Sequence, residues 1–411
     1  MLGVTRETGT LARRCSFCGE DRRKVDRLVE GQGGVAICGD CARLAAELTS
    51  EPESSSGDLL VTGIGTLVTN DTRYGGLLGE IPGAAVAVRN GRVTWVGRER
   101  ALPDRYRELP EIDCGGRMVV PGFVDAHRHF PAVAGTDLAA YTEAAADQLG
   151  RLLEQGATTV EMRSFGAPDP ETEVTVLSAV AAAGDMLPCD VVTSVVVGTD
   201  PPPRGRGYQT MLESLLLPTV ARVASYLDVV VGGPLDRDAA KSVITAGRRH
   251  GLRPRVHVFG GEALELAVEG GAVSVDGLWG VDGSAAPLAE TGIVAVSVPA
   301  ASWMDGRKEP ASELWEAGAI VALGSACSGG SVPTIPMAMA IAVHHGGMAP
   351  DAALWAATRG GALALEEPEK GMLGLGATAD LVVLEAETPA DIVAEPGRDP
   401  VWRVIKDGSP L

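Results

Sequence analysis

The hydrophobic residues of this chain fall into short runs whose spacing changes along the sequence. Between residues 58 and 120, runs such as DLLVTGIGTLV and AAVAVRNGRVTWVG are rich in β-branched residues and end at turn residues. The pair Asn90-Gly91 between two such runs predicts a tight hairpin. Similar runs return in GATADLVVLEA and VWRVIKDGSPL, with a turn at Asp407-Gly408. We therefore expect the end of the chain to add strands to those of residues 58–120.

Between residues 121 and 369, apolar runs of strand length alternate with Ala/Leu-rich segments of helix length. Nearly continuous apolar strands joined by helices are typical of a parallel sheet covered on both faces. About eight strands over roughly 250 residues match a closed barrel. We therefore predict an α/β fold in which a (β/α)8 TIM-like barrel, residues 121–369, carries a small composite β-sandwich from residues 58–120 and 370–411. The predicted barrel strands lie in PGFVDAH, GATTVEMRS, CDVVTSVVVG, LDVVVGG, RPRVHVFG, AVSVDGL, GIVAVSVP and AIVALGSA.

Residues 1–50 contain four of the seven cysteines, in two C-x2-C pairs. Four thiolates satisfy the tetrahedral preference of zinc and leave no open position, so the spacing predicts a structural zinc site. A domain of this size buries too little surface to be stable alone, and zinc binding supplies the missing stability. The alternative interpretation is four unpaired buried thiols. The predicted ligands are Cys15, Cys18, Cys38 and Cys41.

The net charge, the length of the apolar runs and the N-terminal segment exclude some functions. The formal net charge of −19 disfavours nucleic acid and anionic membrane surfaces as partners. No apolar run has the length of a membrane span, and the N-terminal MLGVTRETGTLARRC lacks the apolar core of a signal peptide. We therefore expect a cytoplasmic protein, in which reduced cysteines favour a metal site over disulfides. Residues 51–57, EPESSSG, predict a linker.

Three histidines follow apolar runs in the predicted barrel. His127 and His129 lie two residues apart in VVPGFVDAHRHF, and on a strand such residues share one face. His257 ends the run RPRVHVFG. Functional residues of barrels gather where strands end, and three imidazoles with one open position form a zinc site that can activate water. The alternatives are a chance H-x-H pair and a His257 that is an ordinary core residue.

Longer segments of the chain resemble a known family. MVVPGFVDAHRHF, the flanking strands and GMLGLGATADLVVLEA resemble the amidohydrolase superfamily. GATTVEMRSFGAPDPETE, LELAVEGGAVSVDGL and GAIVALGSACSGGSVPTIPM are similar to its imidazolonepropionase branch. The resemblance covers nearly all of residues 58–411. It implies a β/α barrel with a small β-sandwich, and metal-dependent hydrolysis of a non-peptide C–N bond, often in a ring.

The resemblance also shows where this chain departs from the family. The sixth-strand histidine falls at Gly277, and the eighth-strand aspartate, usually both ligand and proton carrier, falls at Ala326. A substrate-contacting histidine falls at Thr199, and an acid after the fifth-strand histidine falls at Gly260. The arginine that follows the H-x-H pair in this branch is absent, and Asp137 is offered there instead.

Hydrolysis needs a group that takes a proton from water and one that gives a proton to the leaving nitrogen. Asp276, Glu262 and Cys327 are candidates for this role, and each is otherwise an ordinary loop residue. Cys327 adjoins the vacant aspartate position and could also be a soft metal ligand. Asp125 could orient one histidine of the H-x-H pair, or its carboxylate could bind backbone amides.

The cysteine segment has its own resemblance. CSFCGE, VDRLVEG and VAICGDCARLAAEL, within residues 13–48, resemble the N-terminal zinc-binding domain of ClpX. The resemblance implies a treble-clef-like module that dimerises and binds adaptors or unfolded segments. The sequence has no G-x-x-x-x-G-K-[ST] motif, so the ATPase motor of that family is not expected.

Two functions remain open from the sequence. The first is a hydrolase with an altered site, which contains a second divalent ion (Zn or Fe) in the barrel beside the structural zinc. Its substrate is a neutral or cationic cyclic amide or amidine rather than imidazolonepropionate, because the anion-binding groups are missing. The second is a catalytically inactive barrel whose zinc module dimerises the chain and binds adaptors or unfolded proteins. We expect a homo-oligomer, and the second function predicts that the dimer depends on residues 1–50.

Overall fold

The computed structural model describes residues 14–25, 27–31, 35–43, 57–130, 137–167, 169–199, 207–257, 261–279, 286–326 and 333–411. The chain divides into two compact units, Met1–Ser55 and Ser56–Leu411. In the described part of the chain, no helix has both the length and the apolar character needed to cross a bilayer.

The N-terminal unit is built around a short antiparallel pair. β1 (Leu28–Glu30) pairs with β2 (Ala36–Cys38), and the single-turn helix η1 (Arg22–Lys24) precedes them. The side chain of Asp21 caps η1 by accepting a hydrogen bond from the amide of Arg23 at 3.0 Å. Among the described residues of this unit, the buried apolar side chains are Cys15, Ala36 and Cys38, as expected of a small unit that a metal stabilises.

The larger unit contains a barrel of eight parallel strands in the order of the sequence. The ring closes between its last and first strands, where the amide of Ala326 donates to the carbonyl of His127 at 2.8 Å. Gly324 lies so close to this junction that a Cβ atom there would stand 2.4 Å from the Cβ of His127. The strands are β8 (Phe123–His129), β9 (Ala157–Arg163), β10 (Asp190–Val197), β11 (Tyr226–Val230), β12 (Arg253–His257), β13 (Ser274–Asp276), β14 (Val294–Ser297) and β15 (Val321–Leu323).

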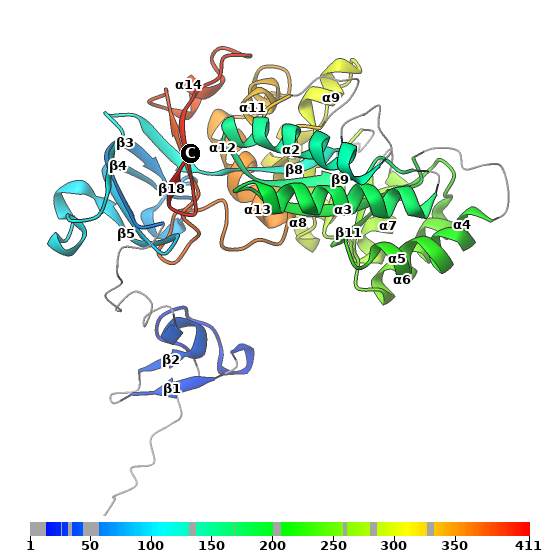
Figure 1. The fold of residues 1–411 in the computed structure, drawn as a ribbon, viewed down its shortest axis with the longest axis horizontal. Coiled ribbons are helices and arrows are strands. Elements are labelled where there is room, and N and C mark those ends of the chain that lie inside the picture. The colour runs from blue at the N-terminus through cyan, green and yellow to red at the C-terminus, as the bar shows by residue number, and fades with distance from the viewer. Residues whose placement is uncertain are drawn as a thin grey trace, which may run out of the picture. The chain divides into compact units, whose positions relative to one another are not determined.

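Helices follow the barrel strands and cover their outer faces, as α2 and α3 show (Figure 1). The alternation that the sequence predicts is therefore confirmed, and so is the barrel. The helical elements are α2 (Leu138–Glu154), α3 (Pro170–Met186), α4 (Tyr208–Met211), η6 (Leu212–Leu216), α5 (Leu217–Val220), α6 (Arg237–Arg249), α7 (Gly261–Gly270), α8 (Ala286–Thr291), α9 (Pro299–Met304), α10 (Ala311–Glu316), α11 (Ile335–His344), α12 (Pro350–Trp355), η7 (Ala356–Gly360), α13 (Gly361–Ala364) and α14 (Pro389–Val393).

A second sheet joins the two flanks of the barrel. β16 pairs with β7, so the end of the chain adds strands to the earlier segment as expected (Figure 1). The turns at Asn90-Gly91 and Asp407-Gly408 have positive φ at both residues, which hairpin turns of this kind require. The strands are β3 (Leu59–Val68), β4 (Glu80–Arg89), β5 (Arg92–Arg98), β6 (Glu111–Asp113), β7 (Met118–Pro121), β16 (Leu381–Leu384), β17 (Val401–Lys406) and β18 (Ser409–Pro410).

The inside of the barrel is charged to an unusual degree. Three arginines are among the largest fully buried side chains of the chain: Arg128, Arg163 and Arg255. Buried carboxylates accompany them on the same or adjacent strands: Asp125, Glu161, Asp228 and Asp276. Such charges are costly unless they are paired, so their arrangement at the strand ends indicates a functional site.

Candidate active site

The three histidines meet at the carboxyl ends of the barrel strands. His127 and His129 lie on the same face of β8, because side chains alternate along a strand, and His257 ends β12. The Nε2 atoms of His127 and His129 are 3.1 Å apart. The ring centroid of His257 lies 5.1 Å from that of His127 and 6.4 Å from that of His129. One ligand atom from each ring lies within 4.8 Å of the others.

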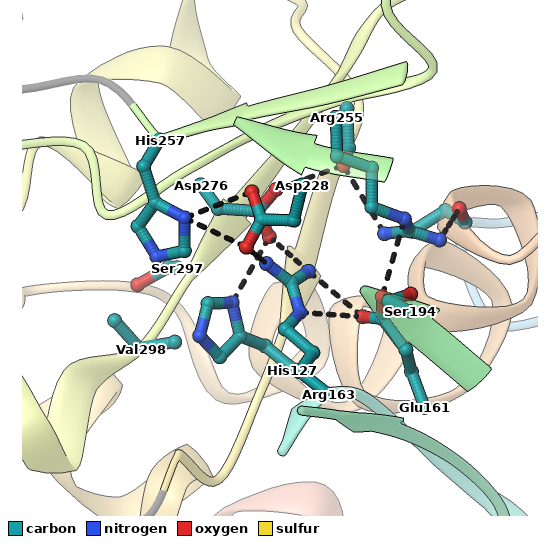
Figure 2. A network of polar contacts seen from close by, with 12 residues as sticks. His127, Glu161, Arg163, Ser194, Asp228, Arg255, His257, Asp276, Ser297 and Val298 are labelled. Carbon is teal, nitrogen blue, oxygen red and sulfur yellow. Dashed lines mark hydrogen bonds and ion pairs between the residues drawn. The ribbon is translucent and has the colours of Figure 1, made fainter. Parts of the chain in front are cut away.

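Carboxylates fix two of these rings from behind. Nδ1 of His127 is 3.1 Å from Oδ1 of Asp276, and Nδ1 of His257 is 2.9 Å from the carboxylate of Asp228 (Figure 2). A carboxylate can only accept, so each Nδ1 carries the proton and each Nε2 presents a lone pair. The ring of His129 hydrogen-bonds the backbone of Ser164. The rings are therefore oriented with their free nitrogens towards one another.

The electrostatics keep two of the rings neutral. Burial, followed by the charge of Arg163, lowers the pKa of His127 well below its ordinary value and that of His129 to about 4. Burial also acts against the charged form of His257, but the carboxylate of Asp228 outweighs it and raises the pKa of that ring. The same partnership lowers the pKa of Asp228. A metal ion requires unprotonated imidazole nitrogens, and His127 and His129 already provide them near neutral pH.

This arrangement fits a divalent metal ion. Because other ring contacts bind His127 to Asp276 and His129 to Ser164, the two Nε2 atoms 3.1 Å apart present lone pairs that repel each other, and a cation between them would remove this repulsion. Two nitrogens bound tetrahedrally to one zinc ion would lie about 3.4 Å apart, given typical zinc–nitrogen bonds. Three imidazoles with converging nitrogens, two of them bound through Nδ1 to carboxylates, are a ligand set suited to zinc or ferrous iron.

The positions that depart from the family do not supply the missing groups. Ala326 has a φ of 44° and only a methyl side chain. Gly277 has a φ of 62°, and a Cβ atom there would lie 3.3 Å from Cδ2 of His257. Asp137 caps α2 by accepting from the amide of Ala140 at 2.8 Å, and Thr199 is exposed. The polar functions that the family places at these positions are therefore not replaced by these side chains.

The remaining candidates have different outcomes. Asp276 binds the ring of His127 and is thus an orienting group. Asp125 accepts from the amides of His127 and Ser325 at 3.3 and 2.9 Å, which supports the backbone-bound alternative. Cys327 and Gly260 lie outside the described residues, as does the side chain of Glu262.

Several site residues were missed by the sequence analysis. Asp228 interrupts the apolar run YLDVV, and Arg163 ends a strand that also contains Glu161, so charges within predicted barrel strands could have revealed both. Trp279 follows β13, and its ring atom Cζ3 lies 4.0 Å from where a Cβ on Gly277 would stand. Its Nε1 donates to Oγ of Ser302 at 2.6 Å, and that hydroxyl donates to the carboxylate of Glu309 at 2.8 Å. Trp279 therefore occupies space beside His257.

The four cysteines of the N-terminal unit also come together. Their sulfur atoms lie within 4.8 Å of one another, with those of Cys18 and Cys38 3.8 Å apart. The amide of Cys38 donates to Sγ of Cys15 at 3.3 Å, as amides do at thiolate zinc sites. Within the described residues, the predicted ligands thus form two clusters, one of four cysteines and one of three histidines.

The fold and the site define the class of protein. A closed β/α barrel with an H-x-H pair at the end of its first strand and a histidine at the end of its fifth is an amidohydrolase arrangement, and the amidohydrolase family model matches residues 298–411. Imidazolonepropionases are similar to this chain over 85% of its length. That of Nocardia farcinica is 37% identical over 391 residues and 97% of its own length, and that of Rhodococcus jostii is 36% identical over 396 residues and 95% of its length. The chain belongs to the imidazolonepropionase family.

Solved structures show the same fold at lower sequence identity. A triazine hydrolase variant superposes with a TM-score of 0.71 at 17% identity, over 86% of this chain and 94% of its own. Molinate hydrolase superposes with a TM-score of 0.68 at 18% identity, over 87% and 95%. The ClpX C4-type zinc finger model matches residues 13–51. The N-terminal unit is thus a four-cysteine zinc finger of that type.

Proposed function

We propose that the barrel is a metal-dependent hydrolase of a cyclic, non-peptide C–N bond in a ring of the imidazolone class. The observation that supports this most directly is the convergence of His127, His129 and His257 within a buried site, with Nδ1 of two rings bound by carboxylates. The similarity to imidazolonepropionases over most of the chain suggests the ring chemistry.

The three histidines would hold one divalent ion, which supplies Lewis acidity towards the ring carbonyl and the attacking water. Asp228 and Asp276 hold the Nδ1 protons of His257 and His127, which fixes the direction in which each Nε2 points. Burial excludes bulk water and strengthens each electrostatic interaction at the strand ends. The chain thus provides binding and orientation.

Proton transfer is the weak step in this site. Ala326 provides no acid–base group, and Asp228 and Asp276 are both occupied by Arg163. Losing a general base typically costs roughly two to four decades in rate. We therefore expect hydrolysis that is slow in kcat rather than poor in substrate binding.

The buried arginines bear on the substituent of the substrate ring. Arg128 donates to Ser325 and to the carbonyl of Ala326, while Arg163 binds three carboxylates. Arg255 binds Glu161, Ser274 and the carbonyl of Ala364. Because protein groups already use these cations, we propose a substrate ring with a neutral or cationic substituent rather than a propionate.

The test is a hydrolysis panel of neutral cyclic amides, amidines and imides beside imidazolonepropionate, with the metal-loaded full chain. The proposal expects turnover of a neutral ring that disappears in His257→Ala. His250→Ala is the matched control, because His250 is an exposed residue at the end of α6. A panel without any turnover, in protein whose barrel metal has been verified, would contradict the proposed activity.

A second candidate function has support from Ala326 and Gly277, where two polar groups of the family are absent at once. In this case the barrel is silent, and the zinc finger dimerises a cytoplasmic chain and binds adaptor or unfolded segments. Light scattering of the full chain and of a Cys18→Ser/Cys41→Ser double variant tests it. Loss of the dimer in the variant supports this candidate, and an unchanged mass contradicts it.

A further inference from the structure

The guanidinium of Arg163 lies between the two carboxylates that orient the histidines (Figure 2). We propose that Arg163 is a positioning residue that fixes the tautomer and direction of His127 and His257 together, through Asp276 and Asp228. This inference rests on the proposed metal site, and it assigns to one side chain the joint orientation of two of its ligands.

The contacts form a continuous chain from one ring to the other. Nη2 of Arg163 is 2.9 Å from Oδ1 of Asp276, the same oxygen that Nδ1 of His127 reaches at 3.1 Å. Nη1 of Arg163 is 2.7 Å from Oδ2 of Asp228, whose carboxylate lies 2.9 Å from Nδ1 of His257. All the side chains between the two rings are fully buried.

The charges explain why a cation is needed at this point. Asp228 and Asp276 lie on β11 and β13, on either side of β12, and repel each other. Without a cation between them, two buried carboxylates would separate or turn towards other donors. Each carboxylate that turns away releases the Nδ1 proton of its histidine and permits the other tautomer.

The shape of the side chain explains why the cation is an arginine. A guanidinium offers donors in a planar fork and can bind two carboxylates at once, whereas an ammonium is a single point charge. Arg163 is held in turn by Glu161 on its own strand, through Nε at 3.1 Å and Nη2 at 2.8 Å. The guanidinium is thus held in place by a contact that involves neither histidine.

Arg255 provides a matched control within the same barrel. It is equally buried and pairs with Glu161 at 3.2 Å, but it donates to Ser274 at 3.1 Å and to the carbonyl of Ala364 at 2.8 Å. Neither group bonds to a histidine ring. Oγ of Ser274 donates to Oδ2 of Asp276 at 2.9 Å, a contact that does not involve the guanidinium and should persist in the Arg255 variants. Replacing either buried arginine should therefore lower the stability of the fold. Only replacement of Arg163 should change the histidine tautomers.

The experiment compares Arg163→Met, Arg163→Lys, Arg255→Met and Arg255→Lys in the full chain. The chain has only six histidines, so 15N-histidine labelling allows the tautomer of each ring to be assigned in metal-free protein. We expect Nδ1-protonated His127 and His257 in the wild type and in the Arg255 variants. The Arg163 variants should show a mixture of tautomers at both rings.

The second measurement is the affinity of the barrel for Co2+ in competition with a chelator, with the cysteine site as an internal reference. Loss of such an orienting partner typically weakens metal binding by about 10- to 100-fold, which we expect for Arg163→Met. We expect a change below about threefold for Arg255→Met. Unchanged tautomers and affinity in a folded Arg163→Met would overturn the inference.

The lysine variants decide the matter if Arg163→Met does not fold. A larger effect of Arg163→Lys than of Arg255→Lys on tautomer and affinity supports the inference, and equal effects overturn it. A wild type that binds no metal in the barrel contradicts the proposed function instead. The tautomers of His127 and His257 still test the role of Arg163 in that protein.

Discussion

Nε2 of His127 and Nε2 of His129 face each other at 3.1 Å on one side of β8. His127 is buried and His129 is partly buried, and burial lowers the pKa of both rings. Because the ring of His127 is bound to Asp276 and that of His129 to Ser164, the facing nitrogens present lone pairs that a cation between them would stabilise. We therefore expect this pair to bind a metal ion together with His257.

His127→Ala should remove the barrel metal and leave the zinc of the finger. We expect elemental analysis to show two metal ions per chain in the wild type and one in the variant, because two histidines hold a divalent ion far less well than three. His250→Ala should retain both ions. Equal metal content in wild type and His127→Ala would show that the barrel site is not what binds metal.

Ala326→Asp should increase hydrolysis. Ala326 has a φ of 44°, a conformation that Asp tolerates better than Ala, and its amide is bound to the carbonyl of His127. A carboxylate next to the H-x-H pair would restore a proton acceptor, and we expect kcat to rise about 10²- to 10⁴-fold. Steady-state kinetics on the best ring of the panel measures this. Ala326→Asn has the same shape without the charge, and an equal gain in that variant would rule out a proton-transfer role.

Trp279→Phe tests whether the ring of Trp279 lines the site beside His257. The substitution removes the hydrogen bond from Nε1 to Ser302, and we expect a loss of about 1 kcal/mol in the free energy of unfolding. The looser ring should raise KM for the substrate more than it lowers kcat. Trp303→Phe is the control, because Trp303 is 53% exposed. The same rise in KM for both variants would show that Trp279 does not line the site.

Glu309→Gln should change how stability depends on pH. Burial raises the pKa of Glu309 from its ordinary value of 4.5 to about 7, although Ser297, Ser302 and the amide of Val298 donate to it. Between these values the folded chain holds a proton that the unfolded chain has lost. Stability therefore falls as pH rises from about 4.5 to 7, by up to about 3 kcal/mol, and is level above.

Urea unfolding at pH 5 and pH 8 measures this effect. The difference between the two midpoints should shrink in Glu309→Gln, while Glu173, whose pKa burial also raises to about 7, preserves part of it. Glu316→Gln on the exposed side of α10 should leave the difference unchanged. A difference that stays at its full size in Glu309→Gln would mean that Glu309 titrates normally.

The sequence alone established much of this protein, because the relevant signals are local. Strand and helix periods repeat within a few residues, so the alternation of apolar runs was enough to predict the barrel. The turns at Asn90-Gly91 and Asp407-Gly408 depend only on two residues each. The spacing of the cysteine pairs and of His127 and His129 likewise indicated ligands that share one turn or one strand face.

Only the tertiary structure decided which distant groups act together. The register of the parallel strands places Asp228 and Asp276 on either side of His257, and no spacing along the chain encodes that neighbourhood. The same register brings Arg163 between them and sets Trp279 against the space that Gly277 leaves. Side-chain partners across a barrel depend on the ring closure and stagger of all eight strands, so they follow from the assembled fold rather than from any segment of the sequence.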